Sequence, residues 1–267
     1  MRRTVSRSHA LTFPHALGLG LLLLTAGARA EQTGPFSPAG AWAEKAYEAA
    51  RARSQSETNS AEAAWQFGRA CFDLAEYAKK NPERGRLANE GMAACRELIA
   101  REPKIAAAHY YLALNIGQLA RAKRLGALRL VSEMELELRW TRDLDENFDY
   151  AGPDRALGLL YLDAPGWPTS IGSRSKARQH LQRAIQLHPE YPGNRLSLLE
   201  AHLKWSNWAE ARKEVSTLQE LWPKARKQFS GESWQPSWLD WEKQREQAQG
   251  KLAEKPAESP KSRGSVP

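Results

Sequence analysis

The chain has 267 residues, of which 42% are hydrophobic and 26% are charged, and its formal net charge at pH 7 is +8. Residues 1–30 contain four Arg and no acidic residue, so the net charge falls from +8 to +4 once they are set aside. In the remainder, Lys and Arg alternate with Glu and Asp, whereas a nucleic-acid footprint needs basic residues clustered on one face. The composition therefore argues against a nucleic-acid partner.

The first thirty residues have the layout of a secretory signal peptide. Three Arg lie in the first seven positions, a short apolar run follows, and an Ala-Arg-Ala tripeptide at 28–30 predicts cleavage before Glu31. The apolar run is too short to span a bilayer comfortably, and no second apolar run follows it. We therefore expect 1–30 to be removed and the mature chain to have no transmembrane segment.

From residue 40 to 245 the sequence reads as helices separated by short breaks containing Pro, Gly or Asn. Apolar residues recur at helical spacing, and no stretch shows the alternation of β-branched residues typical of strands. The pattern predicts an all-α chain. In the N-terminal half, helices are predicted at 39–53, 60–80, 85–103, 105–124 and 126–147.

A pattern of small and apolar residues ending in Pro recurs along the chain. Its second and third copies, which end at Pro189 and Pro223, are 34 residues apart, and 34 residues is the period of tetratricopeptide repeats. The first copy ends at Pro103, which leaves 86 residues before Pro189, or two periods plus 18. The three copies are Gly91, Cys95, Leu98, Ile99 and Pro103; Ala177, Leu181, Ala184, Ile185 and Pro189; and Ala211, Val215, Leu218, Gln219 and Pro223.

This register predicts a tetratricopeptide-like superhelix of antiparallel helix pairs over residues 31–245. The extra 18 residues predict a central insertion at 139–177. Residues 246–267 are nearly free of large apolar side chains and are predicted to be a disordered tail.

Six of the ten Trp lie between residues 205 and 241, and Trp234, Trp238 and Trp241 share one helical face. The simpler interpretation is a helix that caps the exposed end of the superhelix. The alternative is an aromatic patch that binds a partner.

The two Cys leave a similar choice. Cys71 and Cys95 form a disulfide if the helical hairpin brings them together in an oxidising compartment, or else both are small buried hydrophobes. Geometry decides between these alternatives.

Nothing in the sequence predicts an enzyme or a cofactor. The histidines of the mature chain form no metalloprotease or triad pattern, and the Gly-rich stretch 166–173 lacks the Lys of a phosphate loop. One run of acidic residues follows the ligand count of a calcium loop, but Phe148 stands where that loop needs Gly. We therefore favour a polar helix end over calcium binding. The run consists of Asp143, Asp145, Asn147, Asp149 and Asp154.

The stretch "GPDRALGLLYLDAPGWPTSIGSRSKARQHLQRAIQLHPEYPGNRLSLLEAHLK", together with "AHYYLALNIGQLARAKR", resembles the T-component family of TRAP transporter-associated proteins. The resemblance covers roughly residues 85–225. It implies a periplasmic tetratricopeptide protein that works beside a solute-binding protein and a membrane permease. The family's better-known members are lipoproteins, whereas no Cys stands at the cleavage site predicted here.

Two functions are consistent with these observations. The first is a periplasmic binding module, an accessory protein of a TRAP-type transport system that binds a protein partner, such as a solute-binding protein, or a small apolar or acidic ligand. The second is a structural scaffold of a cell-envelope complex without a ligand pocket. For the binding module, we expect the site in the interrupted centre, where insertions of repeat proteins often form the binding face. The predicted site residues are Tyr110, Tyr111, Asn115, Arg155, Tyr161 and Trp167.

Overall fold

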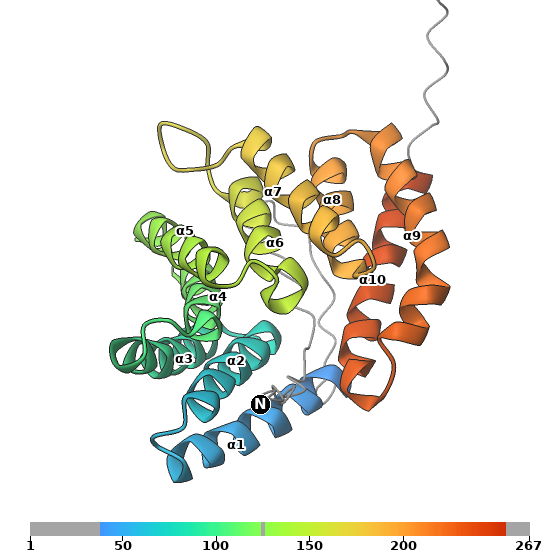
Figure 1. Ribbon diagram of the computed structural model, residues 1–267. Helices are drawn as coiled ribbons and strands as arrows, with labels where there is room; N and C mark the ends of the chain where they lie inside the picture. The colour runs from blue at the N-terminus through green and yellow to red at the C-terminus, as the bar shows by residue number, and fades with distance from the viewer. Residues whose placement is uncertain (1–37, 124–125, 255–267) are drawn as a thin grey trace, which may run out of the picture.

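The computed structural model describes residues 38–123 and 126–254, and every regular element in these ranges is a helix (Figure 1). The all-α prediction is therefore confirmed. The elements are α1 (Pro38–Ser56), α2 (Ala61–Tyr77), α3 (Asn81–Arg101), α4 (Ala106–Ala122), α5 (Ala127–Leu144), α6 (Phe148–Asp163), α7 (Arg174–Leu187), α8 (Pro192–Lys204), α9 (Trp208–Gln228), the short 3-10 turn η1 (Glu232–Trp234) and α10 (Gln235–Ala253).

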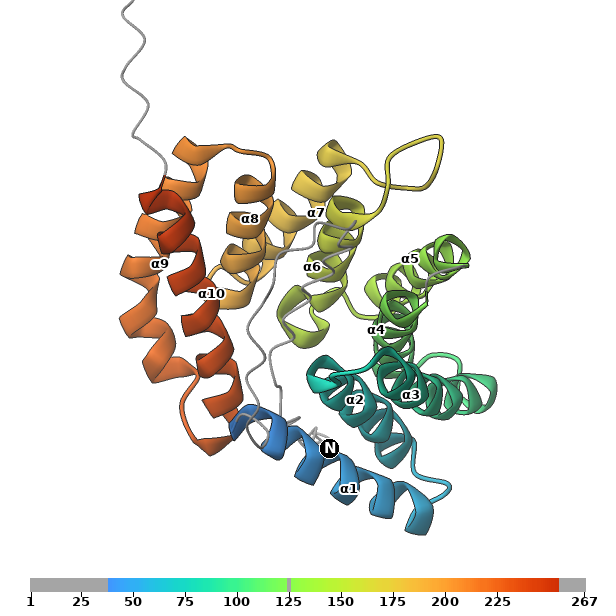
Figure 2. The same cartoon turned by 180° about the vertical axis from the view of Figure 1, so that it is seen from behind.

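The helices stack as antiparallel pairs, α2 with α3, α4 with α5, α6 with α7, and α8 with α9. The backbones of the first members of successive pairs approach one another closely, whereas the second members α3 and α5 are linked through side chains, by the ion pair of Arg96 with Glu133 at 2.5 Å. The first members therefore line the inner side of the curve, and the second members lie outside. The arc turns far enough for α1 to contact α10, as Figures 1 and 2 show from opposite sides.

The 34-residue register places its small residues where neighbouring helices approach most closely. Ala177, Leu181 and Ala184 are all fully buried. A Cβ atom on Gly158 of α6 would come within 2.6 Å of the Leu181 side chain of α7, so this helix pair packs backbone against side chain. The helix-pair interface was therefore predictable from the repeat alone.

The 18 extra residues do not interrupt the stacking. The range 139–177 contains the end of α5, all of α6 and the start of α7, and these helices continue the array. Two irregular features lie within this range: the start of α6 and the α6–α7 loop at 164–173.

The start of α6 is irregular because Asp149, Tyr150 and Ala151 all adopt left-handed backbone conformations, with φ of 50°, 55° and 61°. Such a conformation costs roughly 1–2 kcal/mol for each residue other than Gly. Three successive residues of this kind need compensation, which the buried contacts of Arg155 described below provide.

The last helix runs beyond the predicted limit of 245. The C-terminal end of α10 is Ala253, and two apolar side chains at i and i+4 spacing, Ala248 and Leu252, are buried against the aromatic cluster of the C-terminal pairs. Two residues in an otherwise polar stretch are enough to extend a helix when a neighbouring surface is available to cover them. The remainder of the predicted tail, and the predicted signal peptide, lie outside the described residues. Within the described ranges, no helix is both long enough and apolar enough to cross a membrane.

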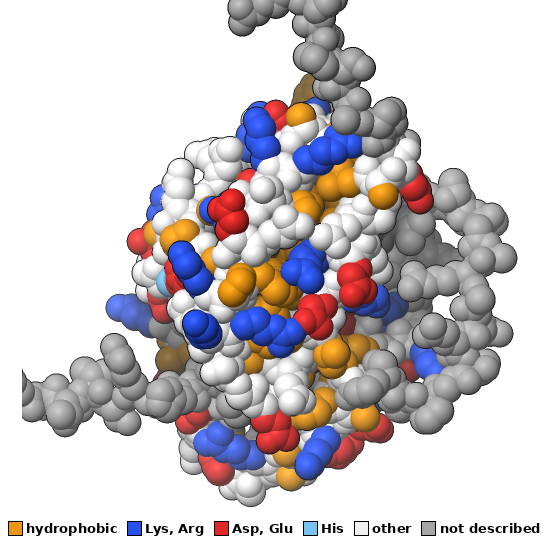
Figure 3. Space-filling model, turned by 90° about the vertical axis from the view of Figure 1, so that its right-hand side faces the viewer, with side chains coloured by type: hydrophobic (Ala, Val, Ile, Leu, Met, Phe, Trp, Pro, Cys, Tyr) orange, Lys and Arg blue, Asp and Glu red, His pale blue; other side chains and the backbone are white. Residues whose placement is uncertain are grey.

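On the face of the molecule shown in Figure 3, basic and acidic side chains are interleaved, with apolar side chains between them. This distribution agrees with the alternation of charges in the sequence.

Candidate functional site

Five of the six residues predicted to form the central site are buried. Their exposed fractions are at most 2%, whereas that of Trp167 is 88%. The five buried side chains therefore offer no binding surface, and the structure does not unite them with Trp167 in one pocket. The buried residues are Tyr110, Tyr111, Asn115, Arg155 and Tyr161.

Arg155 of α6 is the centre of a buried polar network. Its Nη2 atom lies 2.5 Å from Asp149 Oδ2, and its Nη1 atom donates to the carbonyl oxygens of Asp149 and Tyr150 at 3.1 and 3.2 Å. Nη1 also donates to Asn194 Oδ1 of α8 at 2.9 Å. The Tyr110 hydroxyl, from α4, donates to Asp149 Oδ2 at 3.0 Å. The network holds the left-handed segment in place and joins three helix pairs, so its role is structural.

Asn115 and Tyr161 also connect helices. Asn115 Nδ2 donates to the Gly68 carbonyl of α2 at 2.8 Å, and a Cβ on Gly91 of α3 would come within 2.6 Å of the Asn115 amide. The Tyr161 hydroxyl donates to Glu135 of α5 at 2.5 Å. Asn115 and Tyr161 therefore stabilise the packing between neighbouring helices.

The acidic residues of the calcium-like count have separate partners. Asp149 pairs with Arg155, while Asp154 accepts hydrogen bonds from His180 at 2.6 Å and Arg183 at 3.2 Å. No group of three or more metal-ligating side chains occurs in the described part of the chain. Asp149 is therefore paired within α6, whereas Asp154 links α6 to α7.

Cys71 and Cys95 are both free, buried thiols. The structure therefore has no disulfide between them, and both Cys pack as small buried hydrophobic residues. Cys95 lies at the α2–α3 contact, where a Cβ on Gly68 would meet its sulfur atom.

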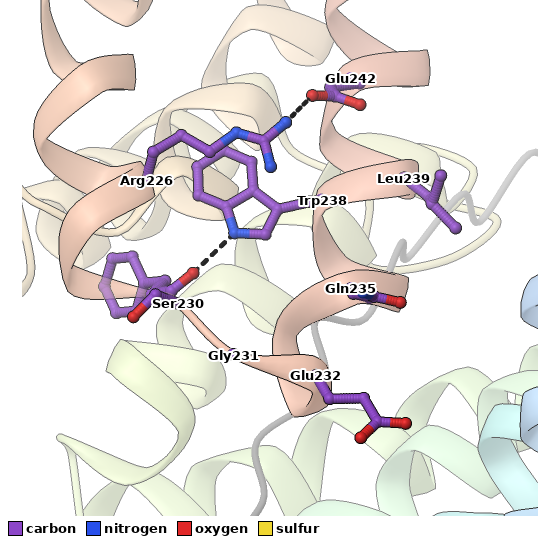
Figure 4. Close-up of a pocket in the computed structure, with 9 residues that line it drawn as sticks. Arg226, Ser230, Gly231, Glu232, Gln235, Trp238, Leu239 and Glu242 are labelled. Carbon is purple, nitrogen blue, oxygen red and sulfur yellow. Dashed lines mark hydrogen bonds and ion pairs between the residues drawn. The ribbon is translucent and has the colours of Figure 1, made fainter.

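The structure forms a pocket at the other end of the chain, between the C-terminal end of α9 and the start of α10 (Figure 4). Its volume is about 630 Å³. The chain turns through Gly231, whose φ of 100° requires a residue without a Cβ, and this turn separates the two helices that form the walls.

An aromatic ring and an exposed Leu form the apolar part of this pocket. Trp238 is anchored because its indole N–H donates to the Phe229 carbonyl oxygen at 2.7 Å. Leu239, on the next position of α10, is 50% exposed. The floor is therefore rigid, and an apolar side chain stands at its edge.

The charged groups of the pocket differ in how they are held. The Arg226 guanidinium lies 4.1 Å from the centre of the Trp238 ring and pairs with Glu242, as Figure 4 shows. Glu232 also lines the pocket, and it has no ion pair among the described residues. One carboxylate is therefore available to a cation.

The capping interpretation of the three Trp is confirmed for two of them, because Trp238 and Trp241 are buried in the cluster that closes the C-terminal end. The sequence reasoning missed the pocket residues Arg226, Glu232 and Leu239. The available signal was Gly231 between two predicted helices, but a Gly break does not show how far two helices diverge.

The stacked pairs, their 34-residue register and the inner and outer layers define a tetratricopeptide-like helical-repeat protein. A thermophilic tetratricopeptide protein of Thermus thermophilus has a similar structure, with a TM-score of 0.57 and 20% sequence identity over 78% of this chain and 93% of that chain. This similarity supports the fold alone. The family model described as regulator of microtubule dynamics protein 1-3 matches residues 39–126, which contain α1 to α4. A comparison with curated proteins finds no match.

Proposed function

We propose that this helical-repeat protein is a protein-binding module, and that the α9–α10 pocket receives a segment of the partner. The observation that carries the proposal is a pocket lined by the anchored Trp238 ring and by the half-exposed Leu239, the next residue of α10. Apolar and aromatic side chains from which a partner excludes water on binding are typical of the residues that dominate binding energy at protein interfaces.

The charges of the pocket define the partner's chemistry. Arg226 is already neutralised by Glu242, whereas Glu232 is unpaired among the described residues. The occupant that fits is an apolar side chain with a basic residue next to it, because the apolar group covers Leu239 and the cation pairs with Glu232. A small ligand fits this pocket less well, because most of the lining residues are exposed and do not enclose a small molecule.

The finer part of the proposal is an accessory role in a TRAP-type transport system of the bacterial periplasm, with a solute-binding protein as the partner. Its support is the resemblance over roughly residues 85–225 and the signal-peptide layout of residues 1–30. Mass spectrometry of the N-terminus of the protein recovered from the periplasm tests the location, because a mature chain that begins at Glu31 is expected. Recovery of an uncleaved chain from the cytoplasm contradicts it.

Quantitative affinity capture from the native organism tests the pocket. Leu239→Arg places a bulky cation at the pocket edge and is expected to lower recovery of the specific partner at least tenfold. Leu136→Arg is the matched control, because Leu136 is an exposed Leu on α5, outside the pocket. Equal recovery of the same proteins by both variants and the parent chain contradicts the proposed site.

A further inference from the structure

The edge of the superhelix that carries the α6–α7 loop has an exposed aromatic residue and several cations. Trp167 is 88% exposed in this loop. Figures 1 and 2 show that the loop projects from the same end of the molecule as the α8–α9 turn. This edge is distinct from the pocket, which lies at the η1 turn between α9 and α10.

The loop is held in one conformation although its tip is exposed. The Gly172 N–H donates to the Pro165 carbonyl at 2.8 Å, and the Ser173 N–H donates to the Tyr161 carbonyl at 2.9 Å. Within the loop, the Thr169 N–H donates to the Gly166 carbonyl at 3.1 Å. These hydrogen bonds fix the loop backbone with Trp167 facing outward. Binding therefore costs less conformational entropy than it would from a flexible loop.

Three cations follow the loop on the first turns of α7. Arg174 and Arg178 lie over the Trp205 ring, at 5.0 and 5.4 Å from its centre, and Lys176 lies 5.0 Å from the centre of the Tyr161 ring. In the part of the chain that the structure describes, none of the three cations forms an ion pair.

The acidic groups near this edge are few. Glu135 accepts from Tyr161 and Arg139, and Asp163 pairs with Lys204, so both carboxylates are engaged with other groups. Glu210 lies on the first turn of α9 and interacts electrostatically with His202, as do Arg174 and Arg178. From residue 164 to residue 189 the sequence contains no acidic residue.

We propose that this edge docks on an anionic lipid bilayer, with Trp167 in the headgroup region and Arg174, Lys176 and Arg178 on lipid phosphates. An indole has an apolar body and one N–H donor, and it is favoured at the membrane interface. Basic residues near an anionic surface add binding energy that salt screens.

The surroundings of Trp167 favour a bilayer over a protein partner. Gly166, Pro168 and Thr169, its neighbours in the loop, are all exposed, so no ring of apolar side chains surrounds the indole. A protein hot spot normally has such surrounding contacts to exclude water. A bilayer interface accepts a single projecting indole without a preformed pocket, and the association expected is weak and reversible.

A fluorophore placed next to Trp167 tests the proposal locally. Thr169→Cys in the full chain, labelled with an environment-sensitive dye, keeps Trp167, and the buried Cys71 and Cys95 do not compete for the label. We expect a blue shift with vesicles of phosphatidylcholine and phosphatidylglycerol. With phosphatidylcholine alone or in high salt, the shift should be much smaller. The same dye on Leu239→Cys of α10 is the positional control and should show no shift.

Substitutions then separate the contribution of Trp167 to vesicle affinity from that of the three cations. In the labelled chain, Trp167→Ala should weaken the dye-detected vesicle affinity at least fivefold, and each change of Arg174, Lys176 or Arg178 to Gln should weaken it about fivefold. Lys176→Gln is the variant least coupled to folding, because the Lys176 amino group has a ring contact only, whereas Arg174 also donates to Asn207. Circular dichroism confirms that each variant is folded.

Three outcomes overturn the proposal. The first is a dye at position 169 that does not respond while the protein still floats with anionic vesicles, since another segment then binds. The second is an unchanged affinity in the Trp167→Ala and Lys176→Gln variants. The third is a shift caused by an acidic polypeptide, such as polyglutamate, and not by vesicles, since the edge is then a site for an acidic protein. Loss of the α9–α10 pocket by Leu239→Arg leaves vesicle binding unchanged, so the two proposals fail independently.

Discussion

Arg155 and Asp149 form an ion pair inside the protein, with 2.5 Å between Nη2 and Oδ2 and only 2% of each side chain exposed. Both residues belong to α6, six positions apart, and the left-handed segment between them brings their side chains together. Contacts of this pair with Tyr110 of α4 and Asn194 of α8 make it the point where three successive helix pairs are connected.

Removing the cation of this pair is expected to destabilise the whole superhelix. Arg155→Met leaves the buried Asp149 side chain without its cation, and breaking a buried pair in this way costs about 3–5 kcal/mol. Urea denaturation followed by circular dichroism measures the loss. The control is Arg142→Met, whose partner Asp143 is exposed, and its cost should be below about 1 kcal/mol. A similar small cost for both variants would contradict the role assigned to Arg155.

The close contact in the repeat at α7 predicts a steric effect. Ala184 is fully buried, so Ala184→Phe overpacks the interface and should lower the free energy of unfolding by about 1–3 kcal/mol. Gln186→Phe on the exposed side of the same helix is the matched control. An unchanged denaturation midpoint for Ala184→Phe would show that this position tolerates volume and that the register is wrong.

A buried carboxyl group at the end of α6 predicts a pH dependence of stability. Burial raises the pKa of Asp163 from 3.8 to about 7, although the paired Lys204 lowers it. Because the pKa is higher in the folded than in the unfolded chain, the folded state holds the proton between about pH 4 and 7. The contribution of Asp163 to stability therefore falls as the pH rises through this window, and the loss is complete above pH 7.

Asp163→Asn tests this sign. The variant should be more stable than the parent chain at pH 8 and equally stable near pH 4, as measured by urea midpoints across this range. Burial also raises the pKa of Asp240 to about 7, so a single variant removes only part of the slope. Asp143→Asn, at an exposed position, is the control. A parent chain that gains stability between pH 4 and 7 while Asp163→Asn does not would reverse the assignment.

The state of the two Cys predicts their reactivity. Burial raises the pKa of Cys95 to about 12 and raises that of Cys71 well above its usual value, so both thiols are protonated and inaccessible at pH 8. Ellman's reagent should detect no thiol in the folded chain and two thiols per chain in guanidinium chloride without reductant. Two fast-reacting thiols before unfolding, or none after it, would contradict the structure.

The sequence by itself determined the helices and their class of packing. Helical spacing and Pro breaks are local properties, so α7 and the small residues Ala177 and Ala184 could be located from the 34-residue register without knowledge of any neighbour. The same register predicted the stacked pairs, because a small residue at a fixed position in each repeat is required wherever two helices approach closely.

Only the tertiary structure decided which polar and aromatic side chains reach solvent. Tyr110 and Arg155 are residue types that are common in binding sites, but helices from neighbouring pairs cover them. The Tyr110 hydroxyl donates to Asp149, which is 39 positions away in the sequence. Trp238 is buried in the core cluster of the C-terminal pairs, and one part of its ring also lines the pocket between α9 and α10. Burial depends on what lies opposite a side chain, and that partner is distant in sequence, so residue type and spacing do not specify it.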